Sequence, residues 1–188
     1  MKLFKNGHIP HIEDQMICNG VDGARAAILS LRSLRDMLSG TNKDLIDVTV
    51  KWDGAPSIFC GIDPKDGKFF VSTKAIFNKN PKVYKTIKDI TDDIEAPQLI
   101  IKMTVALNEL SKLGITGVIQ GDIMFVNDTK EEVINGEYYT TFHPNTIVYG
   151  ILSNTTEAEM VRTANIGVVF HTSYEGDSLE KLTPTLCV

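Results

Sequence analysis

The sequence lacks the features of membrane proteins and of disulfide-stabilised secreted proteins. No apolar run approaches the roughly 18 residues of a membrane-spanning helix, and the opening stretch MKLFKNGHIPHIED turns polar too soon for a secretory signal. Cysteine is scarce, and Cys18, Cys60 and Cys187 are too widely spaced for a disulfide framework or a metal-ligand pattern. We therefore expect a cytoplasmic protein with no membrane partner.

Positive charge is also in short supply. The chain has 19 Lys and Arg against 24 Asp and Glu, a formal net charge of −5, which argues against a protein that grips nucleic acid with its whole surface. The lysines are nevertheless concentrated between Lys65 and Lys88, where Asp66 is the single acid. This local basic patch could bind phosphates or nucleic acid ends, and a solvated lysine-rich loop is the alternative. Its members are Lys65, Lys68, Lys74, Lys79, Lys82, Lys85 and Lys88.

The pattern of apolar residues predicts an α+β fold. The 188 residues suffice for one domain, which we expect over 1–188, with an N-terminal helical segment (1–42) and a core (43–188). Helical spacing is found at 22–39, 98–114 and 156–163, and Gly40 and Gly114 end the first two segments. Strand-like runs lie at 45–51, 56–62, 68–73, 117–125, 137–142, 145–151 and 166–172. Many strands and few helices favour mostly antiparallel sheets.

The stretch VTVKWDGAPSIFCGI, residues 48–62, places a lysine at the end of a predicted buried strand. An amine is a nucleophile only when deprotonated, so the pKa of Lys51 would have to fall from about 10.4. Burial beside Val50 and a nearby cation, either Lys74 or a metal ion, would lower it. Gly54 would let the backbone approach a ligand closely, and Asp53 would accept a hydrogen bond from a ribose hydroxyl. The alternative is an ordinary Asp-Gly turn.

KWDG, with a strand before it and a hairpin after it, resembles the nucleotidyl-acceptor motif of the covalent nucleotidyltransferase superfamily. That superfamily comprises ATP- and NAD-dependent DNA ligases, RNA ligases and mRNA capping enzymes. In its members a Lys-any-Asp-Gly lysine attacks the α-phosphate of a nucleotide and holds the nucleoside monophosphate as a phosphoramidate. The resemblance implies that Lys51 forms lysyl-AMP from ATP, with Mg²⁺ or Mn²⁺ as cofactor.

Other stretches follow in the order that this superfamily has. IQGDIMF (119–125) resembles its third motif, so Asp122 would contact the ribose or a metal ion. NTIVYGI (145–151) resembles the strand whose aromatic ring stacks on the purine, here Tyr149. IGVVFHT (166–172) resembles the fourth motif and adds Val169 to the nucleotide-binding candidates. STKAIF (72–77) lies where the family often places a basic residue near the phosphates, here Lys74.

The sequence departs from this pattern at two places. Ile166 stands where the fourth motif normally has a metal-binding Glu, and Glu175 or Asp177 could compensate from the following turn. The final Lys-any-Lys strand has no match, since Lys181 stands alone, and no C-terminal OB-fold is present. The resemblance thus implies the core of a ligase adenylation domain. Over nearly its whole length the chain also resembles uncharacterised proteins of tailed bacteriophages, including cyanophages, which implies a host-cell cytoplasm.

Three hypotheses for function remain at this stage. The first is an ATP-dependent nucleotidyltransferase resembling RNA or DNA ligases. The second is a catalytically degenerate phage protein that binds nucleotide or nucleic acid reversibly, and the third is a phage structural or host-interacting protein in which KWDG is only a turn. Single residues have simpler interpretations too: Asp122 as a solvent-facing strand residue and Tyr149 as a core aromatic. Trp52 either packs under the hairpin or walls the pocket.

Overall fold

The computed structural model describes residues 12–40 and 52–185, which belong to two compact units that meet in sequence between Lys51 and Trp52. The first unit contains helix α1 (Ile12–Leu38), two helical pieces joined at Gly20, whose φ and ψ are 54° and −131°. As predicted, α1 ends before Gly40, which takes a left-handed conformation (φ 70°) and donates its N–H to Met37 O over 3.0 Å. The predicted strand at 45–51, with Val50 and Lys51, lies outside the described residues. The prediction of one domain over 1–188 stays a prediction.

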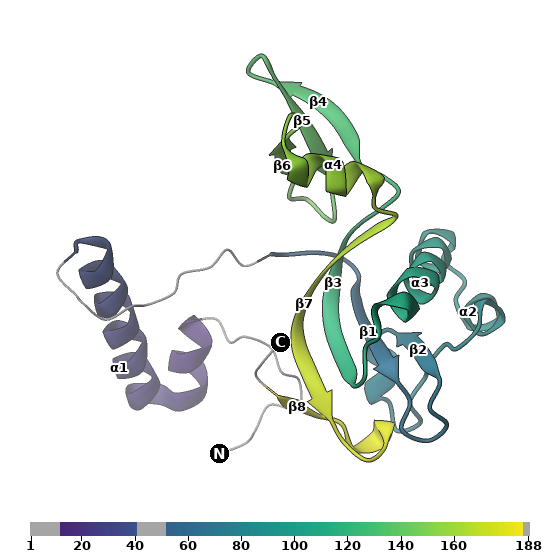
Figure 1. The fold of residues 1–188 in the computed structure, drawn as a ribbon. Helices are drawn as coiled ribbons and strands as arrows, with labels where there is room; N and C mark the ends of the chain where they lie inside the picture. The colour runs from purple at the N-terminus through teal and green to yellow at the C-terminus, as the bar shows by residue number, and fades with distance from the viewer. Residues whose placement is uncertain (1–11, 41–51, 186–188) are drawn as a thin grey trace. The chain divides into compact units, whose positions relative to one another are not determined.

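A five-stranded sheet forms the centre of the second unit (Figure 1). Its strand order is β2-β1-β3-β7-β8, and all neighbours are antiparallel. The strands are β1 (Ser57–Ile62), β2 (Phe69–Ser72), β3 (Val118–Val126), β7 (Ile166–Glu175) and β8 (Thr183–Thr185). The predicted α+β class with antiparallel sheets is confirmed.

Helices α2 (Ile87–Asp93) and α3 (Pro97–Leu110) cover one face of this sheet (Figure 1). Ile58, Ile123 and Met103, all fully buried, belong to the core between sheet and helices. Cys60 lies in the same core, where burial raises the pKa of its thiol to about 12 and makes it a poor nucleophile. The opposite face of the sheet packs on short 3₁₀ turns at Lys74–Phe77 and Leu179–Lys181. No helix in residues 12–40 or 52–185 is long and apolar enough to span a bilayer.

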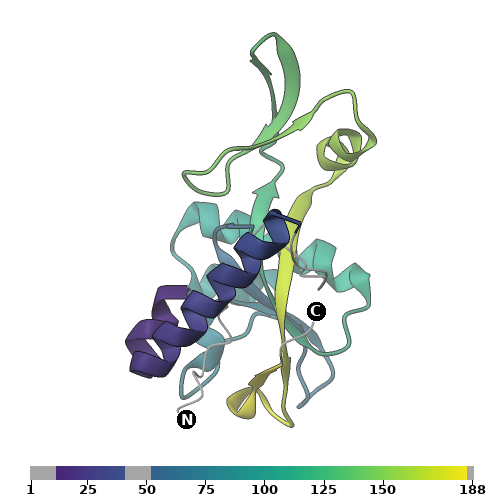
Figure 2. The ribbon, with the colours of Figure 1, turned by 90° about the vertical axis from the view of Figure 1, so that its left-hand side faces the viewer.

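A smaller sheet is inserted between β3 and β7. Its strands β4 (Lys130–Ile134), β5 (Glu137–Phe142) and β6 (Tyr149–Leu152) are antiparallel, and helix α4 (Thr156–Thr163) precedes β7. Figures 1 and 2 show this sheet beyond the ends of β3 and β7. The segments that connect this sheet to β3 and to β7 are joined by a hydrogen bond, in which the N–H of Asn127 donates to Asn165 O over 3.1 Å. Met124 and Phe125 from β3 pack on Phe142 beneath it.

Most predicted elements are found, with shifted ends. The hairpin of β1 and β2, the helix ended by Gly114 and the helix at 156–163 are confirmed. Strand β6 begins only at Tyr149, although the prediction began at 145. Three short elements, α2, β4 and β8, were not predicted. Each has fewer than eight residues, so too few apolar positions repeat to reveal a period.

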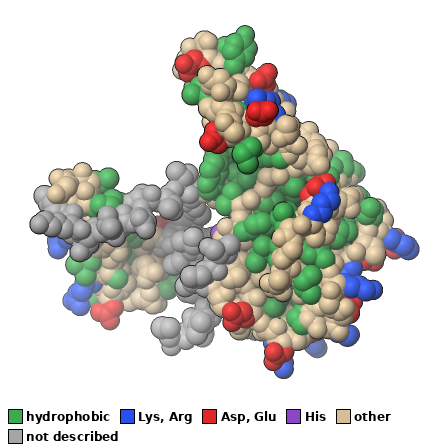
Figure 3. Space-filling view, viewed as in Figure 1, with side chains coloured by type: hydrophobic (Ala, Val, Ile, Leu, Met, Phe, Trp, Pro, Cys, Tyr) green, Lys and Arg blue, Asp and Glu red, His purple; other side chains and the backbone are tan. Residues whose placement is uncertain are grey.

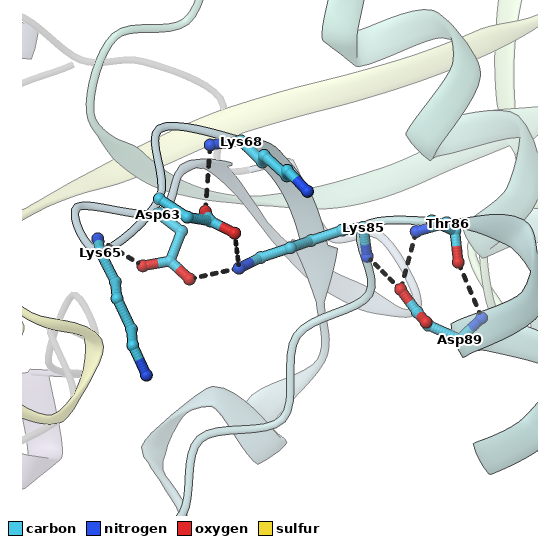
Figure 4. A network of polar contacts seen from close by, with 7 residues as sticks. Asp63, Lys65, Lys68, Lys85, Thr86 and Asp89 are labelled. Carbon is cyan, nitrogen blue, oxygen red and sulfur yellow. Dashed lines mark hydrogen bonds and ion pairs between the residues drawn. The ribbon is translucent and has the colours of Figure 1, made fainter.

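The β1–β2 turn is held by an ion-pair network (Figure 4). The Lys85 ammonium reaches Asp63 Oδ2 at 2.6 Å and Asp66 Oδ2 at 3.0 Å. The Asp63 side chain is only 6% exposed, and its other oxygen accepts the backbone N–H of Lys65 over 2.9 Å. Asp89 closes the neighbouring capping box of α2 by accepting the N–H groups of Lys85 and Thr86.

These contacts shift the pKa values of the network. Partial desolvation lowers the pKa of Lys85, but its hydrogen bonds to Asp63 and Asp66 outweigh this and raise the pKa overall. The Lys85 ammonium and the backbone N–H of Lys68 hold the pKa of Asp66 below its ordinary value. The backbone N–H of Lys85 does the same for Asp89, helped by Thr86 against partial desolvation.

We predict that Lys85→Met lowers the free energy of unfolding by about 1–3 kcal/mol, because it leaves the carboxylate of Asp63 buried without its cation. Lys88→Met is the matched control, since the Lys88 side chain is 79% exposed and pairs only with Asp92. Its expected cost is about 0–0.5 kcal/mol. Urea denaturation measures both, and equal costs would contradict a structural role for the network.

We also predict that Asp89→Asn flattens the acid limb of the stability profile. The native pKa of Asp89 is lowered, so its contribution is present above the unfolded-state pKa of about 3.9 and is lost as pH falls through the native value. The melting temperature should therefore fall more steeply in the wild type than in the variant between about pH 5 and about pH 2.5. Parallel curves would show that Asp89 makes no pH-linked contribution.

Candidate functional site

The two residues that follow KWDG, Ala55 and Pro56, are hydrogen-bonded to the middle of β3. The backbone N–H of Ala55 donates to Ile123 O over 3.0 Å, and Ile123 N–H donates to Pro56 O, also over 3.0 Å. The Ala55–Pro56 peptide bond is cis. Gly54 therefore lies beside Asp122 and Ile123 of the stretch IQGDIMF (119–125).

Gly54 allows this close approach. A Cβ added at Gly54 would lie 2.7 Å from the carbonyl oxygen of Ile123, 2.8 Å from Met124 Sδ and 2.9 Å from Asp122 Cβ. The sequence predicted a glycine that leaves room for a ligand. In the structure the nearby backbone is that of β3, so Gly54 lets the loop pack directly on Ile123 and beside Asp122.

Asp53 is held from the other side by the inserted sheet and its entry loop. The N–H of Asp53 donates to Tyr149 Oη over 3.0 Å. The side-chain amide of Asn145 donates to Asp53 O over 3.2 Å and to Asp53 Oδ2 over 3.0 Å. The amide oxygen of Asn145 in turn accepts Ile147 N–H over 2.7 Å. The carboxylate of Asp53 is exposed but fixed in direction, which suits a hydrogen-bond acceptor for a ligand hydroxyl.

An aromatic column leads from the core to the surface at this place. The ring of Phe125 lies 5.3 Å from that of Phe142, which stacks on Tyr149 at 5.5 Å with an interplanar angle of 18°. Tyr149 is 4.9 Å from Trp52. Phe125 and Phe142 are buried, whereas Trp52 is 41% exposed. Trp52 thus borders the site beside Tyr149.

Asp122 lies in a polar row across the main sheet. It pairs with Ser57 of β1 and with Val169 of β7, and its side chain is 21% exposed. Among the described residues, the side chain that forms an ion-pair contact with Asp122 is His171, whose Nε2 lies 3.8 Å from Asp122 Oδ1. Val169 also packs against the cluster of Met124, Phe125 and Phe142 beneath Tyr149. Asp53, Gly54, Asp122, Tyr149 and Val169 are therefore brought together.

Lys102 is a site residue that the sequence analysis did not identify. It extends from α3, and its ammonium donates to Ala55 O over 3.0 Å. No carboxylate of the described residues pairs with it, so within that part of the chain its charge meets a carbonyl oxygen rather than an acid. A lysine inside the apolar helix QLIIKMTVALNEL was the available signal, but a lysine on a helix surface is too common to single out.

The lysine-rich segment is less basic than its sequence suggests. Lys82, Lys85 and Lys88 form ion pairs with Asp93, with Asp63 and Asp66, and with Asp92. In the face seen in Figure 3, Lys and Arg are interspersed with Asp and Glu. No ion pair within the described residues involves Lys65, Lys68, Lys74 or Lys79, so these four carry the remaining positive charge.

Lys74 lies near the site, not in contact with it. β2 ends at Ser72, which pairs with Phe59, so the chain reaches Lys74 at the end of the sheet where Ser57 and Asp122 lie. No contact between Lys74 and these residues is present in the described structure. A phosphate would have to bridge that space.

Carboxylates are few around Asp122. Ile166 pairs with Val126 and packs its side chain on the helix-covered core, where the fourth motif would have Glu. Glu175 lies at the far end of β7 and pairs with Thr183, nine residues from Ile166 in the chain. It does not replace the missing carboxylate at Ile166. In the part of the chain that the structure describes, no three His, Cys, Asp or Glu side chains gather as a metal-ligand group.

The comparisons with known proteins name a family and no activity. The chain belongs to the family described as "Family of unknown function (DUF6267)", which matches residues 6–187. No curated protein matches the chain, and no solved structure matches it. The function must therefore be argued from the site.

We predict that Gly54→Ala destabilises the protein by about 1–3 kcal/mol, because a methyl group would collide with the β3 backbone. Gly117→Ala is the matched control, since a Cβ there meets no atom within 4 Å. It should leave stability unchanged or slightly raised. Thermal unfolding without ligand measures both variants. If Gly54→Ala is as stable as the wild type, the loop does not pack on β3 as described.

Proposed function

We propose that this chain is an ATP-dependent nucleotidyltransferase, resembling RNA and DNA ligases, that forms lysyl-AMP at Lys51. One observation carries the proposal. Asp53 and Gly54 of KWDG are bound between Asp122 on β3 and Tyr149 on β6, which come from stretches about 70 and 95 residues away in the chain. A turn without function requires no such convergence with the other stretches that the resemblance named.

The proposed reaction is a substitution at the α-phosphorus of ATP. The neutral amine of Lys51 forms a bond to phosphorus, the bond from phosphorus to the pyrophosphate oxygen breaks, and the amine loses its second proton to water. The products are lysyl-AMP and pyrophosphate. The charge that develops on the leaving pyrophosphate requires cations near the phosphates.

The described residues have distinct roles in this proposal. The ammonium of Lys102 fixes the loop at Ala55 O and adds a positive charge to it. Asp53, oriented by Asn145, accepts a hydrogen bond from a ribose hydroxyl. Lys74, near the same end of the sheet, neutralises phosphate oxygens.

A divalent metal ion fits this site with a single protein ligand. Mg²⁺ is commonly held by one or two carboxylates together with substrate phosphates and water, and Asp122 is the carboxylate that faces the loop. Bound Mg²⁺ or Mn²⁺ would neutralise charge on the phosphate oxygens. Asp122 would hold it, and His171 Nε2 lies 3.8 Å from Asp122 Oδ1.

The proposed acceptor of AMP is a 5′-phosphate end of RNA or DNA. A ligase passes AMP to that end and then joins it to a 3′-hydroxyl. The four lysines without ion pairs in the described structure, Lys65, Lys68, Lys74 and Lys79, are the candidates to contact the nucleic acid backbone.

Reversible nucleotide binding is the second candidate function. Ile166 favours it, because its apolar side chain packs on the core where the resemblance implies a metal-binding Glu. Such a protein would bind ATP at the same residues and leave Lys51 unmodified.

The deciding experiment incubates the protein with Mg²⁺ and α-labelled ATP, followed by denaturing electrophoresis. We expect label on the wild type, none on Lys51→Ala, and full labelling of Lys112→Ala, a control lysine that is exposed and paired with Glu109. γ-labelled ATP should leave no label, since that phosphate departs with pyrophosphate.

Absence of label with Mn²⁺ and added pyrophosphatase would reject the covalent mechanism. Thermal stabilisation by ATP would then separate reversible binding from no binding, because a ligand of the native state stabilises by mass action.

A further inference from the structure

The exposed end of the aromatic column carries the strongest inference beyond the proposed function. Trp52 follows Lys51 directly and is the only tryptophan of the chain. Its ring is 41% exposed, which is unusual for the largest apolar side chain. Large aromatic rings left partly open beside polar groups commonly serve as contact surfaces for planar ligands.

Tyr149 has little freedom to serve as a contact surface for a planar ligand. Its hydroxyl accepts the N–H of Asp53, and its ring packs on both Phe142 and Trp52. It is therefore committed to the loop and to the column. Trp52 is the member of the column that is open to solvent, while Phe125 and Phe142 at the other end are 5% and 4% exposed.

Polar groups at the residues that follow Trp52 match the rest of a nucleotide. The exposed Asp53 carboxylate, oriented by Asn145, is an acceptor in the adjoining residue. Lys102 brings an ammonium to Ala55, three residues further along the same loop. A planar ring, a hydroxyl acceptor and a cation thus follow one another along four residues of chain.

We propose that Trp52, not Tyr149, is the surface on which the nucleobase stacks, and that Tyr149 is a positioning residue that holds the Trp52–Asp53 segment. This inference rests on the proposed nucleotide site, but not on covalent chemistry. Stacking on tryptophan tolerates any base, so the ring selects for a planar aromatic group and leaves base identity to other contacts.

The single tryptophan makes the inference directly measurable. Titration of the wild type with ATP and Mg²⁺ should quench the emission of Trp52 until the site is full. Inorganic tripolyphosphate, which has the phosphates but no base, should not quench it. Equilibrium dialysis with labelled ATP gives the affinity independently of fluorescence.

Two variants separate stacking from loss of structure. Trp52→Ala should weaken ATP binding by about 5- to 150-fold, the range for removing one base-stacking ring, and Trp52→Phe should recover part of that loss. Tyr138→Ala is the matched control, since Tyr138 is an exposed aromatic (64%) on the smaller, inserted sheet. The ATP affinity of this variant should equal that of the wild type. If Trp52→Ala unfolds, Trp52→Phe and the titration decide.

The outcomes distinguish this inference from the proposed function. Lysyl-AMP formation with unchanged Trp52 emission, and with unchanged ATP affinity in Trp52→Ala, would overturn the stacking role and leave the enzyme intact. Quenching by ATP and weakened binding in Trp52→Ala, without lysyl-AMP, would support the stacking role and reject the covalent reaction. If dialysis detects no ATP binding to the wild type, both fall.

Discussion

The candidate site depends on one constraint, the contact of the loop at Gly54 with the backbone of β3. The two hydrogen bonds of Ile123 with Ala55 and Pro56 hold the loop against the strand. Because Gly54 has no side chain, its Cα can approach the backbone of β3 closely. Every other relation in the site follows from this contact. Asp53 reaches Tyr149 and Asn145, Trp52 reaches the end of the aromatic column, and Lys102 finds a carbonyl oxygen to bind.

The main sheet supplies this contact with a rigid support. β3 lies between β1 and β7, so its backbone is paired on both sides. One face is buried under α2 and α3, and the other carries Asp122 with Ser57 and Gln120, which are linked through a 3.0 Å hydrogen bond from Gln120 to Ser57. Tyr174 donates to Gln120 over 2.6 Å, and burial raises the pKa of this tyrosine. Asp122 therefore projects from a surface whose polar neighbours are already hydrogen-bonded to one another, and this limits its own movement.

Much of this arrangement could be predicted from the sequence, because the signals were local. The turn signal DPKDG (63–67), the helix end at Gly114 and the long strand-like runs can each be recognised within a few residues of sequence. Alternation along a strand also puts Asp122 and Met124 on one face, and both approach Gly54. Asp53, Gly54, Asp122, Tyr149 and Val169 were selected together by the resemblance to covalent nucleotidyltransferases, and the fold brings them to one place.

The remaining features are set by tertiary contacts. The partners of Lys85 are aspartates, one of them just outside the lysine-rich window, and a count of charge cannot reveal which carboxylates fold back onto which amines. Lys102 is separated from Ala55 by 47 residues, so only the packing of α3 on the sheet joins them. The contacts of Tyr149 could not be predicted for a similar reason, because its hydroxyl partner and both ring contacts come from other segments. Strand β4, whose residues are mostly exposed, is defined by its pairing with β5.

The paired connections at Asn127 and Asn165 give the molecule a modular character. Because the chain leaves β3 and returns to β7 at adjacent points, the segment 128–164 is a cassette between two strands that already pair with each other. The main sheet keeps the loop and Asp122, whereas the cassette contributes Asn145 and Tyr149. Replacement of the cassette alone would thus change the residues at positions 145 and 149 and leave the main sheet as it is. This part of the site could therefore change in evolution without a change in the fold.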